Sequence, residues 1–97
     1  MKRLLRDQRS VSVLTTSTQL LGPQDRRFSL IISAPASNRI TLSFLGAAVL
    51  DEGITLHPGG PPLVLEWDTL GGSITASIQA IAAIAAQTIG VVEVFWP

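Results

Sequence analysis

Short runs of alternating apolar and polar residues recur along this chain, and they constrain its fold more than any other feature. Residues 26–33 place Phe28, Leu30 and Ile32 on one face of an extended segment and the polar residues between them on the other. Residues 39–45 repeat the pattern. A period of two residues is typical of a half-buried β-strand and differs from the 3.6-residue period of a helix. The pattern therefore predicts β-structure.

Turn-forming segments divide the chain into pieces of strand length. Strands are expected at 11–14, 17–21, 26–33, 39–45, 53–57, 63–67, 73–80 and 89–95. Segments rich in Gly, Pro, Asp or Asn separate them, at 22–25, 34–38, 51–53, 58–62 and 68–72, and residues 34–38 suit a hairpin loop. About seven or eight short strands at this spacing predict an all-β domain, a small antiparallel sandwich or jelly-roll-like barrel, with an Ig-like sandwich as the other arrangement.

One segment, residues 77–87, fits two structures. Ile78, Ile81 and Ile84 recur every three residues, and the alanines between them favour helix. The neighbouring alternation favours a strand. Both remain open at this stage. In either form the segment is apolar on nearly every side, so we expect it to be buried in the core or against a neighbouring subunit.

The composition indicates a subunit of a larger assembly. A chain of 97 residues forms one small domain with little surplus stability. Hydrophobic residues make up 46% of it and charged residues only 14%, against a usual charged fraction of about 25%. Because a free monomer with so few charges is prone to associate, we expect neighbouring chains to cover much of its exterior.

The positive charge is concentrated at the start of the chain, where four of the seven basic residues lie. The formal net charge is zero, which excludes a generally basic nucleic-acid binder. Residues 1–9 nevertheless carry four basic side chains against Asp7, a net charge of +3. We predict a basic arm at 1–9 and a single sandwich domain at 10–97, with the arm contacting another protein subunit in preference to nucleic acid. The basic residues of this predicted interface are Lys2, Arg3, Arg6 and Arg9.

Nothing in the sequence indicates catalysis. There is no cysteine and a single histidine, His57, beside a Pro-Gly-Gly turn. No nucleophile elbow, phosphate-binding loop or regular acidic calcium loop occurs, so we expect no enzyme activity, no cofactor, no metal site and no small-molecule substrate. Residues 69–92 lack charge, but Gly, Gln, Ser and Thr interrupt them, and we expect no membrane span.

Aromatic residues mark two further candidate sites. Phe95 and Trp96 follow the last predicted strand; they either complete the core or anchor an intersubunit pocket, as buried interface aromatics do. Trp67 lies between Glu66 and Asp68, a pattern that suits a stacking platform for a carbohydrate or receptor. That platform is the basis of an alternative function, a ligand-binding β module.

Four segments together resemble a known family. Residues 27–35 (RFSLIISAP), 53–60 (GITLHPGG), 72–74 (GSI) and 90–94 (GVVEV) are similar to small β-sandwich structural proteins of bacteriophage virions. In that family an Arg-led strand, a Gly-x-x-Leu-x-Pro-Gly turn and a final Val-rich strand with Glu follow in this order. The chain departs from it at Ser33-Ala34, where the family usually has Asn, and in its terminal aromatics. The resemblance implies a decoration, vertex or minor capsid protein of the virion that is oligomeric and not catalytic, and whose partners are further copies and other capsid proteins.

Overall fold

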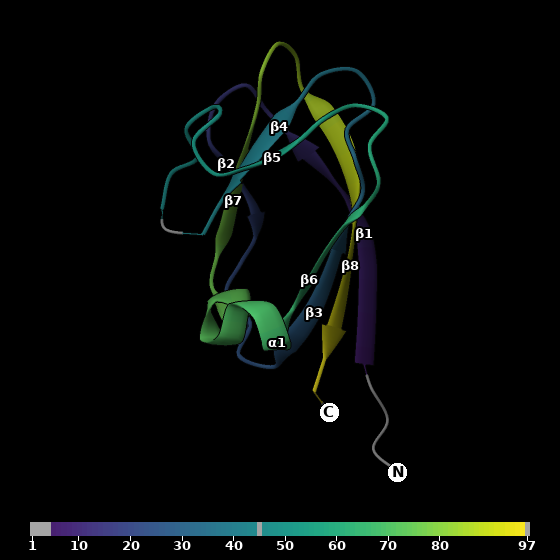
Figure 1. The fold of residues 1–97 in the computed structure, drawn as a ribbon, viewed down its shortest axis with the longest axis vertical. Helices are drawn as coiled ribbons and strands as arrows, with labels where there is room; N and C mark the ends of the chain where they lie inside the picture. Colours follow the sequence, from purple (N-terminus) through teal and green to yellow (C-terminus); the bar gives the residue numbers. More distant parts are fainter. Residues whose placement is uncertain (1–4, 45, 97) are drawn as a thin grey trace.

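Eight strands form two sheets that pack face to face (Figure 1). A computed structural model describes residues 5–44 and 46–96. One sheet has the strand order β1-β8-β3-β6 and the other has the order β2-β7-β4-β5. The strands are β1 (Leu5–Val13), β2 (Thr18–Leu21), β3 (Arg27–Ile32), β4 (Ile40–Ser43), β5 (Ile54–Leu56), β6 (Leu63–Glu66), β7 (Ile78–Ala82) and β8 (Gln87–Phe95).

The topology is that of a jelly roll. Every strand pair is antiparallel, and consecutive strands cross from one sheet to the other, except β4 and β5, which pair as neighbours. An eight-stranded double sheet with these crossings defines the jelly-roll architecture. The predicted all-β sandwich is confirmed, and the strand alternation located all eight strands to within a few residues, except at the start of β1 and of β7.

The loop at 34–38 does not close a hairpin, contrary to the sequence-based prediction. It carries the chain from β3 in one sheet to β4 in the other. Side-chain amides hold the crossing: Asn38 Oδ1 accepts from the Ile84 amide at 3.1 Å, and Gln87 Oε1 accepts from the Ser37 amide at 2.9 Å. These buried polar groups replace the ladder hydrogen bonds that a hairpin would supply.

A short helical segment lies where the sequence predicted a loop and the start of a strand. Helix α1 (Trp67–Leu70) continues into a 3-10 turn, η1 (Gly71–Thr75), at the lower end of the sandwich in Figure 1. The apolar Ile74 is fully buried and closes that end of the core. Strand β7 therefore starts at Ile78 and not at Ser73.

Residues 78–82 form a strand between β2 and β4, which settles the ambiguity of this segment in favour of β. Ile78, Ala80 and Ala82 point into the core, where small alanines fit between the sheets. Ile84 lies in the following loop with 79% of its surface exposed, so the expected burial on every side does not extend to this residue within the chain itself.

Residues 5–9 of the predicted arm are the first half of a strand, and residues 1–4 lie outside the described residues. Strand β1 begins at Leu5 and pairs with β8 from Leu5 opposite Phe95 to Val13 opposite Gln87. A division of the chain at residue 9 therefore falls inside one strand. No helix in the described part of the chain is long and apolar enough to span a membrane.

Candidate binding cleft and interaction face

A buried ion pair organises the end of the sandwich that carries α1. Arg27 and Glu93 are only 1% and 3% exposed, and Arg27 Nε donates to Glu93 Oε2 at 2.9 Å. The rest of the guanidinium donates to three backbone carbonyls, those of Gly22 at 2.7 Å, Ile74 at 3.0 Å and Ala76 at 3.1 Å. Arg27 thus joins the loop after β2, the turn η1 and strand β8, and its charge is paired, as burial requires.

A β-bulge places Arg27 inside and Phe28 outside. Across β3 and β8, Arg27 lies opposite Phe95 while Ser29 lies opposite Val94, so one extra residue is inserted on β3. The sequence alternation had placed Phe28 with the core residues Leu30 and Ile32, and that assignment is wrong. A bulge shifts the pleat by one residue and re-aims the side chains beside it. Consequently Phe28 and Ser29 both line the same outer cleft.

That cleft has a volume of about 280 Å³ and brings together the aromatic and acidic residues of this end. It is lined by Phe28, Ser29, Glu66, Trp67, Asp68 and Trp96. Trp67 and Trp96 remain 43% and 47% exposed. Phe28 and Trp96 stack with their ring centroids 4.2 Å apart and an interplanar angle of 26°. The predicted platform at residues 66–68 and the terminal Trp96 are therefore parts of one site.

Beside the cleft, the outer face of the β1-β8-β3-β6 sheet carries a short row of aliphatic side chains. The register aligns Val64, Ile31 and Val92 in one row across three strands. Val64 and Ile31 are 52% and 36% exposed. Residues with alternating exposure on an antiparallel sheet normally present polar groups to water. In this row the outward positions of β6, β3 and β8 are aliphatic, a pattern typical of an interaction surface. The outward positions of the edge strand β1 are polar: Gln8, Ser10 and Ser12.

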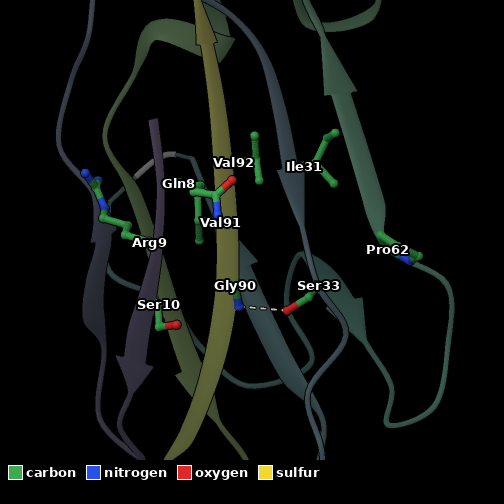
Figure 2. A pocket seen from close by; sticks show the side chains of 9 residues that line it. All are labelled: Gln8, Arg9, Ser10, Ile31, Ser33, Pro62, Gly90, Val91 and Val92. Atoms are coloured by element: carbon green, nitrogen blue, oxygen red, sulfur yellow. Dashed lines mark hydrogen bonds between the residues drawn. The ribbon is translucent and has the colours of Figure 1, made fainter. Parts of the chain in front are cut away.

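A hollow of about 350 Å³ lies beside this row, where Gly90 carries no side chain. Figure 2 shows Ile31 and Val92 with Pro62 and Ser33 around it. Ser33 Oγ accepts from the Gly90 amide at 2.7 Å, and the Ser33 amide donates to the Gly90 carbonyl at 2.9 Å. The backbone amide and carbonyl of Gly90, at the bottom of the hollow, therefore both have hydrogen-bond partners within the chain.

Of the four basic residues of the predicted interface, the structure describes the side chain of Arg9 only. Lys2 and Arg3 lie outside the described residues. Arg6 lies in β1 opposite Val94, and only its backbone is described. Arg9 Nη2 lies 3.1 Å from Glu93 Oε1, so Arg9 contributes to the ion pair within its own chain.

The remaining candidates lie apart from one another. Phe95 is half-buried and lines a separate small pocket beside Arg9 and Arg27. His57 is exposed at the end of β5, where its carbonyl accepts from the Gly60 amide. Among the described residues, no three His, Cys, Asp or Glu side chains group closely enough to hold a metal ion. Phe28, Ile31 and Val64 were not among the sequence-based site candidates. Phe28 was assigned to the core because simple alternation does not reveal the bulge. Ile31 and Val64 would have been found from their outward, apolar positions in the alternation.

At the surface, Arg39 and Asp51 form a two-bond ion pair. Arg39 Nε and Nη2 donate to the Asp51 carboxylate at 2.7 and 2.9 Å. These hydrogen bonds lower the pKa of Asp51 from its ordinary value of 3.8; partial desolvation opposes them, and the charges of Arg39 and His57 add to the lowering. Asp51 has a positive φ of 64°, which Asp and Asn tolerate better than most residues.

The Asp51→Asn variant should reduce the acid sensitivity of folding. Because the folded pKa is below the unfolded one, ionised Asp51 stabilises the fold above its ordinary pKa, and this contribution is lost as the pH falls through the lowered value. We expect the melting temperature of the wild type to fall more than that of the variant between about pH 6 and about pH 2.5. Thermal denaturation followed by circular dichroism measures both; equal falls would contradict the assignment.

No protein-family model matches the sequence, and no curated protein matches it. In fold, the chain is similar to a solved structure of Bacillus endospore appendages, described as a family of disulfide-linked pili. The similarity covers 99% of this chain and 90% of the other, with a TM-score of 0.57 and 10% sequence identity. At this identity the similarity establishes a shared all-β architecture.

Proposed function

We propose that the chain is a non-catalytic structural subunit that associates with further copies of itself through the outer face of the β1-β8-β3-β6 sheet. The observation that carries the proposal is the aliphatic row in which exposed Val64 and Ile31 lie beside half-buried Val92. Burying such a face would contribute roughly 25 cal/mol per Å² before the costs of association. A second copy is the natural occupant, because most homo-oligomers are built from self-complementary patches or repeated head-to-tail contacts.

Two further observations support a subunit that polymerises or builds a shell. The fold is similar to that of a protein described as forming pili, and the sequence resembles bacteriophage virion proteins. The finer proposal, a minor capsid, decoration or vertex protein located in the virion, rests on that sequence resemblance alone. Because the chain has no cysteine, its copies would associate without disulfides.

Light scattering at several concentrations tests the association. We expect wild-type chain to form oligomers, and the double variant Ile31→Gln/Val64→Gln to associate at least about tenfold more weakly, since each central apolar contact typically contributes 1 kcal/mol or more. The matched control, Val49→Gln/Ile84→Gln, removes two comparably exposed apolar side chains elsewhere and should leave the mass unchanged. A wild-type monomer at all concentrations would exclude the proposal.

A second candidate function is a ligand-binding β module. The observation that favours it is the convergence of Trp67 and Trp96 with two carboxylates in one cleft. If the chain is monomeric in solution and its tryptophan fluorescence changes on addition of a ligand, ligand binding becomes the favoured function.

A further inference from the structure

We propose that the aromatic cleft is a binding site for an organic cation, an alkylammonium or guanidinium group held against the tryptophan faces with carboxylates beside it. The site goes beyond the proposed self-association and does not depend on it. Its walls come from four places in the chain: Phe28 and Ser29 on β3, Glu66 at the end of β6, Trp67 and Asp68 in α1, and Trp96 after β8.

The aromatic rings supply the first part of the recognition. An indole face carries negative electrostatic potential and attracts a cation within about 6 Å of its centre, by roughly 0.5 to 2 kcal/mol according to how far the cation is desolvated. Trp67 and Trp96 are each half-exposed in the cleft, and Phe28 stacks on Trp96 and supports it. Quaternary ammonium groups are recognised by aromatic groups of this kind.

The charges supply the second part. Two carboxylates, those of Glu66 and Asp68, line the cleft, and the described residues that line it include no Lys or Arg. A negatively charged and aromatic cleft complements a cation. A neutral pyranose could use the Ser29 hydroxyl and the two indole N–H groups as donors, but it brings no positive charge to the acidic side of the cleft.

The site is held in place by bonds already described. Arg27 is adjacent to Phe28 and donates to the Ile74 carbonyl in η1, the turn that follows the helix of Trp67. It also donates to Glu93, which lies on β8, the strand that precedes Trp96. The Trp96 amide also donates to the Arg26 carbonyl at 2.7 Å. Walls that are fixed before binding lower the ordering cost of the ligand complex.

The fluorescence of the intact chain reports this cleft directly, because Trp67 and Trp96 are its only tryptophans and it has no tyrosine. We would titrate it with choline and, in parallel, with 3,3-dimethyl-1-butanol, a neutral molecule of nearly the same shape. We expect saturable quenching by choline that weakens with added salt, and no saturation by the alcohol at the same concentrations. N-acetyl-lysine and N-acetyl-arginine amides then show whether a protein side chain serves as well as a free small cation.

Charge and ring variants complete the test. Asp68→Asn should weaken choline binding about threefold to tenfold and Trp67→Ala about tenfold or more, while the matched carboxylate variant Glu52→Gln, at an exposed turn, should not change it. The titration is repeated on Ile31→Gln/Val64→Gln, so that association cannot hide the cleft. Absence of choline binding in both backgrounds, equal binding of the neutral isostere, or tighter binding of methyl glucoside would each overturn the proposal.

Discussion

Replacing Arg27 with methionine is expected to lower the free energy of unfolding by about 3–5 kcal/mol, the usual cost of removing one partner from a buried ion pair. The substitution leaves Glu93 charged and almost fully buried, with Arg9 as its remaining ion-pair partner among the described residues. It also removes the donors to the carbonyls of Gly22, Ile74 and Ala76. For a domain whose total stability is of order 5–15 kcal/mol, the loss is large.

Urea denaturation measures this effect, and two further variants identify its origin. Arg39→Met removes an arginine that donates two hydrogen bonds to one exposed carboxylate at the surface, and it should change the midpoint little. Arg27→Met/Glu93→Leu should recover the part due to the carboxylate that has lost Arg27, but not the part due to the three carbonyls, which still lack the Arg27 donors. If Arg27→Met were no more damaging than Arg39→Met, the organising role of the buried pair would be wrong.

The Gly53→Ala variant is expected to destabilise the chain by roughly 2–3 kcal/mol, because two penalties coincide at this position. Gly53 has a φ of +143°, and a Cβ there would lie 2.3 Å from the Leu42 carbonyl oxygen. That oxygen belongs to β4, which pairs with β5 immediately after Gly53. Since the obstacle is backbone, relief requires the β4–β5 hairpin to move.

A series of glycine variants separates the two penalties by thermal and urea denaturation. Gly59 has a φ of +76° with open space around it, so Gly59→Ala should cost only the conformational part, about 1–2 kcal/mol. Gly72 has open space and no positive φ, so its alanine variant should be neutral or slightly stabilising. Equal losses at Gly53 and Gly59 would show that the close approach to Leu42 has no energetic weight.

The sequence was sufficient to predict where the strands lie, but not to predict the bulge in β3 or the course of the chain between strands. Alternation located β3 and β4 because their inward residues, such as Leu30 and Leu42, follow the two-residue pleat. It misassigned Phe28 and Arg27, because a bulge depends on the pairing of β3 with β8, some 60 residues away. The crossing at 34–38 looked like a hairpin, since local turn chemistry does not specify which sheet the next strand joins.

The candidate site was half predictable for the same reason. Trp67 with its flanking acids stood out in the sequence, and Trp96 was noted separately, but only the tertiary fold brings them together with Phe28. Of the predicted basic arm, Arg9 lies within a strand and pairs with the buried carboxylate of Glu93, while Lys2 and Arg3 lie outside the described residues. In each case the pairing of strands far apart in the sequence determines which side chains lie together, and a local sequence pattern does not contain that information.

The central position of β8 has a consequence for how the protein is made. Strands β1 and β3 both pair with β8, which follows every other strand in the chain. During synthesis the sheet cannot close until residues 87–95 have been added, and until then β1 and β3 lack this partner. Such non-local pairing folds slowly and leaves strand edges open to other chains. Nascent chains that still lack residues 87–95 would therefore expose open strand edges, and synthesis of many copies close together raises the chance that these edges associate.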